Sequence, residues 1–261
     1  MIALSANELQ NWVAELYWPF VRVGSCLMIA PAFGAETVPA RVRIVLAGSL
    51  TLLIAPLLPA PPPVAAFSGA GALITVQQLL IGLSLGFCVR ILFDSVTLGG
   101  QMLANSMGLS MAYNVDPLHA SDASTPALGQ LYTLLVMLTF LSLNGHLALI
   151  EVLVQSFHSL PVGTAGLGVA GLHTIAGWGS QLFAGALSIA LPGVTALLIV
   201  NLAFGVMSRA APAFNLFAIG LPVSLVFGLV ITALGLPAVQ ATFMELMART
   251  FATLQLLISA P

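Results

Sequence analysis

The chain has 261 residues, of which 59% are hydrophobic and only 5% are charged. Soluble domains carry about 25% charged residues, and a mean hydropathy of +1.09 implies more apolar side chain than a soluble core of this length can bury, so composition favours a membrane-type protein. The basic residues are six arginines and the formal net charge is -2, which argues against a nucleic-acid-binding surface.

A helix needs about 20 mostly apolar residues to cross the hydrocarbon core of a bilayer. The sequence predicts an all-α membrane-type protein with about six long helices. In chain order these helices are predicted to cover residues 9–30, 42–58, 73–93 with a helical pattern persisting to 106, 127–154, 178–207 and 216–234. The tail after Pro237 is predicted to form one more short amphipathic helix, in which Glu245 and Arg249 lie one turn apart.

Proline and glycine interrupt this pattern repeatedly. The proline run at 59–63 and the glycine-rich segment 159–173 are predicted to be loops. Five further prolines fall within or at the ends of predicted helices: Pro19, Pro31, Pro56, Pro192 and Pro222. Such breaks leave backbone carbonyls unsatisfied, which lipid does not tolerate but neighbouring protein does. The pattern therefore predicts that many helix faces contact other protein chains.

The arginines between helices indicate an orientation. With six spans, the first, third and fifth connections share one side of the membrane, and they contain Arg41, Arg43 and Arg209. The second and fourth connections contain no arginine. Because connections on the cytoplasmic side carry an excess of positive charge, the sequence predicts that the arginine side is cytoplasmic and the N-terminus lies outside.

Two short motifs resemble enzyme signatures without their structural setting. The stretch "GLSLG" at 82–86 matches a nucleophile elbow centred on Ser84, which His146 would have to activate, but that elbow needs a strand, a turn and then a helix. Here it lies inside a long apolar helix, so Gly82 and Gly86 are interpreted as a small-residue face for helix packing. The stretch "GLGVAG" at 166–171 lacks the preceding strand of a dinucleotide site and is interpreted as a loop.

No catalytic, cofactor or metal site is predicted. The four histidines do not pair with carboxylates at metal-ligand spacing. Both cysteines, Cys26 and Cys88, lie inside apolar segments and are interpreted as packed thiols. We therefore do not expect an enzyme.

Charged residues inside predicted spans are few. Arg90 and Asp94 stand four residues apart on one predicted helix, and we expect them to neutralise each other, with a proton relay as the alternative. Arg22 and Glu151 have no local partner of opposite charge. Each is predicted to meet another segment, another subunit or a water-filled path.

The most polar and least regular stretch lies at the centre of the chain. Residues 108–126 read "GLSMAYNVDPLHASDASTP" and follow Met102 and Met107. Gly108 permits a backbone break, and methionine adapts to changing shapes. An external loop is one interpretation. A re-entrant segment that lines a cavity within the assembly explains both the methionines and the polar residues, and is favoured.

Two motifs in this chain resemble a known family. "QMLANSMGLSMAYNVDP" at 101–117 and "MSRAAPAFNLFAIGLPV" at 207–223 are similar to the central and second signatures of the FliR family, the channel subunit of the flagellar type III export gate. The order of predicted helices also fits, so the resemblance covers essentially the whole chain. The family has a related subunit in the injectisome, which is kept as the alternative.

The resemblance implies roles for particular residues. In the family the central segment projects into a pore as a plug, which here corresponds to 108–122, with Met107 and Met111 near the constriction. The implied plug and constriction residues are Met102, Asn105, Met107, Gly108, Met111, Tyr113, Asn114, Asp116 and Pro117. The implied cytoplasmic hairpin tip contains Arg209, Pro212 and Asn215, although Ala213 stands where the family often has glutamine.

The resemblance also implies partners and a setting. Family members assemble with FliP and FliQ into a helical hetero-oligomer that contains one copy of this chain, within the basal body of the bacterial inner membrane. Residues 1–175 would correspond to a FliP-like part and 176–261 to a FliQ-like hairpin whose tip lies near FlhB. The family sits partly above the bilayer plane, so predicted spans can be helices packed in protein. A small-molecule transporter, the rival from another class, would show repeated halves with matched broken helices.

Overall fold

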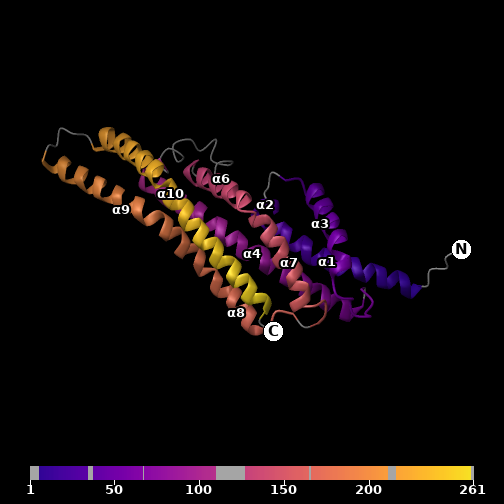
Figure 1. Cartoon of the computed structure of the whole chain (residues 1–261). Helices are drawn as coiled ribbons and strands as arrows, with labels where there is room; N and C mark the ends of the chain where they lie inside the picture. The colour runs from indigo at the N-terminus through magenta and orange to yellow at the C-terminus, as the bar shows by residue number, and fades with distance from the viewer. Residues whose placement is uncertain are drawn as a thin grey trace. The chain divides into compact units, whose positions relative to one another are not determined.

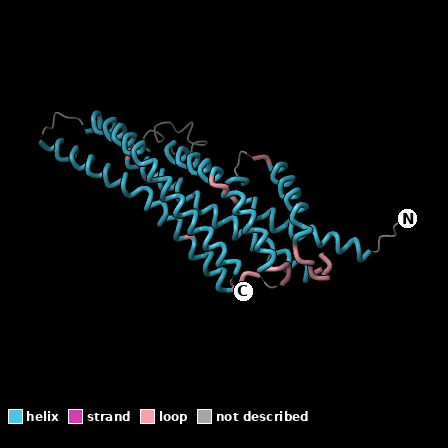
Figure 2. Tube along the Cα trace, viewed as in Figure 1, coloured by secondary structure: helices cyan, strands magenta, loops and turns pink. Residues whose placement is uncertain are grey.

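The computed structural model shows a chain built from α-helices, with no strand in the segments it describes (Figure 2). It describes residues 6–34, 38–66, 68–109, 127–164, 166–210 and 216–259. The helices, labelled in Figure 1, are α1 (Ala6–Ile29), α2 (Pro31–Gly34), α3 (Ala40–Ile54), the 3-10 turn η1 (Ala55–Leu57), α4 (Gly69–Ser106), α6 (Ala127–Ser142), α7 (Gly145–Ser159), α8 (Val169–Trp178), α9 (Ser180–Ala210) and α10 (Leu216–Ser259). The all-α prediction is confirmed.

Two predicted boundaries are wrong. The helix predicted for 127–154 is broken, because α6 and α7 are bent by 65° at a short connection. Asn144, in that connection, adopts the left-handed conformation with φ 56°, which asparagine tolerates better than most residues. The loop predicted for 159–173 is also too long, and the stretch 166–171 within it is only half loop, since α8 begins at Val169, before the predicted helix start at 178.

The separate short C-terminal helix is not observed. Instead α10 runs without interruption from Leu216 to Ser259 and contains both Pro222 and Pro237. A proline in a helix interior removes one backbone hydrogen bond. Neighbouring helices or side chains can satisfy the carbonyl that it leaves free, so Pro237 does not end the helix. By contrast, α4 reaches Ser106, as the helical pattern predicts.

Fewer helices than predicted have the length and composition of a membrane span. Among the described residues, four continuous segments qualify, or five if the bent α6–α7 pair counts as one span. The four are Ala40–Leu57, Gly69–Ser106, Val169–Ala210 and Gly220–Ser259. The first predicted span, α1, is not among them; it contains Glu8, Glu15 and Arg22.

The chain divides into two compact units, each made from separated stretches of sequence. Unit 1 comprises residues 1–91, 141–179 and 249–261, and unit 2 comprises residues 92–140 and 180–248. In unit 1, Trp18 and Ile74 are fully buried together beneath the partly buried Tyr17 and Val162. In unit 2, the ring of Phe93 meets Phe140 and Phe243 edge to face, at centroid distances of 5.3 and 5.7 Å. Each unit therefore has an apolar core of its own.

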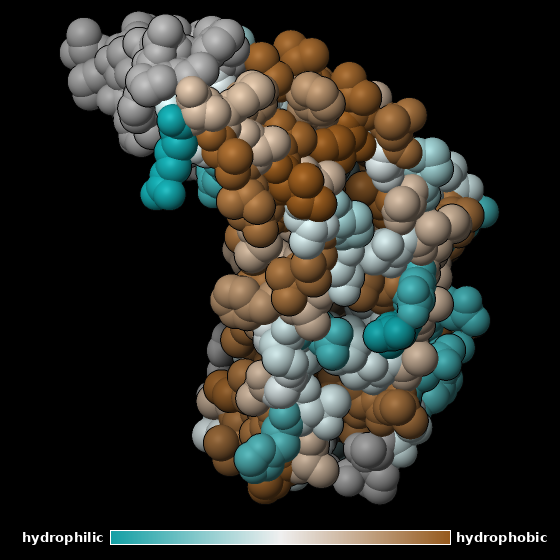
Figure 3. Space-filling view, turned by 90° about the vertical axis from the view of Figure 1, so that its left-hand side faces the viewer, coloured by the Kyte–Doolittle hydropathy of each residue, from teal (hydrophilic) through white to brown (hydrophobic). Residues whose placement is uncertain are grey.

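Apolar side chains also cover much of the outside. Figure 3 shows hydrophobic residues over a large part of the visible face. On α9 and α10, for example, Leu202 is 68% exposed and Leu234 is 78% exposed. A surface this apolar suits contact with lipid or other protein chains and does not suit bulk water.

Candidate functional site: the end of α4 and its surroundings

The structure describes part of the predicted plug and hairpin residues. Met102, Asn105, Met107, Gly108 and Arg209 lie within the described segments. The remaining predicted residues lie outside them: Met111, Tyr113, Asn114, Asp116, Pro117, Pro212 and Asn215.

Gly108 ends α4 and begins the central segment. Its φ is +82°, a left-handed conformation that glycine adopts without steric cost and that commonly ends helices. The N–H of Gly108 donates to the carbonyl of Asn105 at 3.0 Å, and the N–H of Met107 donates to that of Leu103 at 3.1 Å. The sequence prediction of a backbone break at this glycine agrees with this geometry.

Met107 is anchored in a notch on α10. Its side chain is 1% exposed, and a Cβ added at Gly228 would lie 2.7 Å from the Met107 sulfur. One turn earlier, Leu103 occupies a matching space at Gly193 of α9, where an added Cβ would lie 2.7 Å from Cδ1 of Leu103. The last turns of α4 are therefore locked to both helices of the α9–α10 pair, and in the single chain Met107 does not line an open surface.

The opposite side of this helix end is more open. Asn105 is exposed and Met102 is half-buried. Because residues two positions apart point to different sides of a helix, Asn105 faces away from the side on which Leu103 and Met107 are buried. The end of α4 thus has one anchored face and one polar, accessible face.

The helix that follows the central segment is fixed to α4 as well. Gly100 of α4 approaches Gly129 of α6 so closely that an added Cβ would lie 2.9 Å from the Gly129 Cα. One turn from each of these glycines, the hydroxyls of Thr97 and Thr133 share a hydrogen bond of 2.6 Å. The two helices that flank the central segment, α4 and α6, are therefore packed tightly against each other within unit 2.

The α9–α10 pair is an antiparallel hairpin whose two helices run side by side (Figure 1). Between them, Ser224 donates a hydrogen bond to the side-chain carbonyl of Asn201 at 2.7 Å. Arg209 is exposed in the last turn of α9, where a cation is favoured by the helix dipole. Residues 211–215 lie outside the described residues, so the hairpin tip stays a prediction.

Unit 1 contains a buried arginine that joins three elements. Arg22 of α1 is 0% exposed, and its Nε donates to the side chain of Gln78 on α4 at 2.8 Å. Its Nη1 donates to the carbonyl and hydroxyl of Ser156 at 2.8 and 3.1 Å, and its Nη2 donates to the carbonyl of Leu160 at 2.8 Å. The guanidinium also lies 4.1 Å from the ring centre of Phe157.

These contacts answer the question that the sequence left open for Arg22: it meets other segments of its own chain. The guanidinium donates to neutral oxygens at the C-terminal end of α7 and on Gln78. Carbonyls at the C-terminal end of a helix carry partial negative charge, and the Phe157 ring adds a cation–π contact. Glu151 has a different environment, since it is exposed and accepts a 3.3 Å hydrogen bond from Gln155.

Gly82 and Gly86 lie where α1 approaches α4. A Cβ on Gly82 would collide with the Arg22 carbonyl and the Ser25 hydroxyl, and one on Gly86 would lie 2.6 Å from the Cys26 carbonyl. Ser84, between them, donates its hydroxyl to the Leu80 carbonyl of its own helix at 2.7 Å. It sits inside α4, without the strand and turn of a nucleophile elbow. The stretch therefore has the geometry of a helix-packing face.

Comparison with known proteins decides the family. The model of the family described as bacterial export proteins, family 1, matches residues 13–250. This chain belongs to that family. Among its relatives, the flagellar biosynthetic protein FliR of Escherichia coli K12 is 37% identical over 99% of this chain and 98% of its own length. The proteins of the same name from Pectobacterium carotovorum and Bacillus subtilis are 33% and 26% identical, over 96% and 92% of this chain and 95% and 93% of their own lengths.

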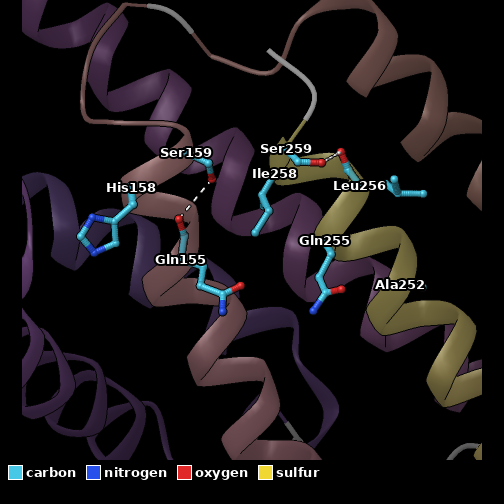
Figure 4. A pocket seen from close by; sticks show the side chains of 8 residues that line it. All are labelled: Gln155, His158, Ser159, Ala252, Gln255, Leu256, Ile258 and Ser259. Carbon is cyan, nitrogen blue, oxygen red and sulfur yellow. Dashed lines mark hydrogen bonds between the residues drawn. The ribbon is translucent and has the colours of Figure 1, made fainter.

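The export protein has a further hollow that sequence reasoning did not identify. About 620 Å³ in volume, it lies in unit 1 between the C-terminal turns of α7 and α10, over the buried Ile258 (Figure 4). Its polar lining consists of Gln155, His158, Ser159, Gln255 and Ser259. The two serine hydroxyls each donate to a carbonyl of their own helix, and the imidazole of His158 points away from the space between the two helices (Figure 4), so the two glutamine amides are its main polar side-chain groups.

Sequence reasoning placed Arg90 and Asp94 one turn apart, and α4 is continuous through both. Asp94 is half-buried and Arg90 is exposed. Their mutual neutralisation stays a prediction. The partners of Arg22 were missed because Gln78 and Ser156 stand 56 and 134 positions away, and no local pattern links such distant residues.

Proposed function

We propose that this chain is the FliR-type subunit of a flagellar type III export gate and forms, with FliP and FliQ, the channel through which unfolded flagellar proteins leave the cytoplasm. The observation that supports this most is the similarity over nearly the full length to proteins named flagellar biosynthetic protein FliR. The exposed apolar helix faces add support, because a chain that assembles with other membrane proteins needs such faces. The flagellar names of the relatives favour this over an injectisome role.

Within that channel, we propose that residues 108–122 act as a plug. The support is physical: Gly108 turns the chain out of α4, and Met107, Leu103 and Gly129 hold its flanks firmly. A segment held between fixed ends can close a pore when no substrate is present and be displaced when one passes. The half-buried Met102, together with Met111 in the segment itself, would repack around substrates of different shape while limiting ion flow, whereas Met107 anchors the helix end.

The remaining features of the proposal concern orientation. The hairpin tip at Arg209 would lie on the cytoplasmic side of the bacterial inner membrane, near FlhB, in agreement with the positive-inside rule. The proposed complex contains one copy of this chain.

A purification from the native host tests the proposed partners directly: a tagged chain should carry FliP and FliQ with it in a fixed ratio, in one large complex.

Deleting residues 110–120 tests the plug. The deletion leaves the anchors at Met107 and Gly129 in place, so the complex should still assemble and co-purify with its partners. Cells that express the deletion should leak ions. We expect their membrane potential to dissipate faster than that of cells with the intact chain. A deletion of Ala60–Pro62 in the loop before α4 serves as the control of similar kind. Normal ion retention in an assembled plug deletion would refute the plug.

A further inference from the structure

The helix α3, together with η1, has the properties of a segment that faces lipid on every side except the one that packs against α1. The 18 residues Ala40–Leu57 form an apolar helix about 27 Å long, given the helical rise of about 1.5 Å per residue, which approaches the ~30 Å hydrocarbon core. Only 17% of it is buried. Apolar side chains emerge on several of its sides, including Val45, Leu52 and Leu53, each more than half exposed. A single protein partner would cover one face, whereas lipid surrounds a helix.

A mainly apolar groove runs between α3 and α1 in unit 1. It has a volume of about 390 Å³ and is lined by Leu16, Tyr17 and Phe20 of α1 and Gly48, Thr51 and Leu52 of α3. The Thr51 hydroxyl is already engaged, since it donates to the Ala47 carbonyl at 2.7 Å. Gly48 has no neighbouring atom within 4 Å of where a Cβ would lie, so the groove is open there. Such a lining suits a hydrocarbon chain.

One of two nearby arginines is aligned with this groove. Arg41, Gly48 and Leu52 stand at i, i+7 and i+11, which places them on the same face of an α-helix. Arg41 is exposed, in a first helical turn that contains no acidic residue, and lies about 10 Å along the axis from Gly48. Arg43 points about 160° away from Arg41 around the helix, and its Nε and Nη2 donate to the Val38 carbonyl at 3.1 and 2.9 Å.

We propose that Arg41 and the α1–α3 groove form a binding site for an anionic phospholipid. The acyl chain lies in the groove beside Gly48 and Leu52, and the phosphate-bearing head group lies at the Arg41 guanidinium. A basic residue at an anionic membrane surface attracts such lipids, and guanidinium binds phosphate through paired N–H groups. The residues of this site all belong to unit 1, and the proposal does not rest on the proposed channel.

The test uses the full chain, purified with the subunits that accompany it and placed in lipid nanodiscs. One preparation contains phosphatidylglycerol with a photoreactive diazirine on its acyl chain, and the other contains phosphatidylcholine with the same acyl chain. After illumination, mass spectrometry maps the labelled residues. We expect labelling at 16–20 and 48–52 to be about fivefold stronger with phosphatidylglycerol, the effect of one basic residue at an anionic surface.

Four variants separate the explanations. Arg41→Gln should reduce labelling by phosphatidylglycerol to the level seen with phosphatidylcholine, Arg41→Lys should keep most of it, and Arg43→Gln should leave it unchanged as the matched control on the same turn. Leu52→Trp should block the groove and lower labelling by both lipids. Equal labelling of wild type and Arg41→Gln would overturn the proposal. So would the absence of lipid labels at both segments in the wild-type chain.

Discussion

Arg22 is a buried cation that neutral oxygens hold in place. Burying a charge is costly unless hydrogen bonds compensate it, and here Gln78, Ser156 and Leu160 supply them. The same contacts tie the end of α7 to α1 and α4. Arg22 therefore stabilises the packing of unit 1, where the sequence alone left a water-filled path or another subunit as alternatives.

Replacing Arg22 by alanine should destabilise the chain strongly. The change leaves the Gln78 side chain and the carbonyls of Ser156 and Leu160 buried without their donor, at a cost of about 1–3 kcal/mol for each group. We expect a lower thermal midpoint for the purified assembly, followed by loss of the chain from a gel-filtration peak on heating. Arg209→Ala, which removes an exposed arginine from the last turn of α9, should change the free energy of unfolding by no more than about 1 kcal/mol. Equal midpoints for the two variants would show that the Arg22 contacts carry no stability.

The Met107–Gly228 contact makes a second prediction about single residues. Gly228→Val places a side chain where the Met107 side chain lies, and such overpacking costs about 1–3 kcal/mol. Met107→Ala opens the space again, so the double variant should be more stable than Gly228→Val alone. Thermal unfolding of the four proteins in the cycle measures this coupling. Additive effects of the two substitutions would show that the Met107 side chain does not fill the space beside Gly228.

At the scale of elements, two substitutions in the stretch 82–86 of α4 test whether it serves helix packing or contains a catalytic serine. Gly82→Val should prevent the close approach of α1, because its Cβ would meet the Arg22 carbonyl and the Ser25 hydroxyl, and the chain should accumulate poorly. Ser84→Ala, two residues away, removes only a hydroxyl bonded to its own helix and should support normal flagellar export. Chain abundance and secreted flagellar protein measure the two effects. Loss of export with normal abundance in Ser84→Ala would favour the hydrolase interpretation.

Helix content and several boundaries could be predicted from hydrophobic pattern alone. The hydrophobic pattern predicted that α4 extends to Ser106. Gly108 indicated a break after it, because glycine permits the left-handed conformation found there. The pattern failed at Pro237 and Asn144. A proline ends a helix only where no neighbour satisfies the freed carbonyl, and a single asparagine inside an apolar run gives little warning of a 65° bend.

The candidate site was only partly predictable. The methionines, Gly108 and the small residues at 82 and 86 were visible as residue types in the sequence. The notches at Gly193 and Gly228 that receive Leu103 and Met107 were not, because they lie about 90 and 120 positions further along the chain. Sequence pattern identifies which residues are adaptable or small; it does not say which of them meet.

At the scale of the whole molecule, each compact unit is assembled from separated stretches, and α4 and α10 each contribute residues to both. The central segment leaves from unit 2, where α4, α6, α9 and α10 fix its flanks. Such a chain has exposed apolar helix faces, and tightly packed helices flank its polar central segment. Both features are expected of a channel subunit within a larger assembly.

The most direct test of the channel proposal is a cross-link to a polypeptide caught in transit. A photoreactive amino acid is placed at Asn105, on the accessible face at the end of α4, in cells that express a flagellar substrate fused to a domain too stable to pass. The account predicts a cross-link between position 105 and the stalled substrate, and none from position 53 on α3. Cross-links from position 105 to partner subunits or lipid alone, with the substrate demonstrably stalled in the same cells, would contradict the account.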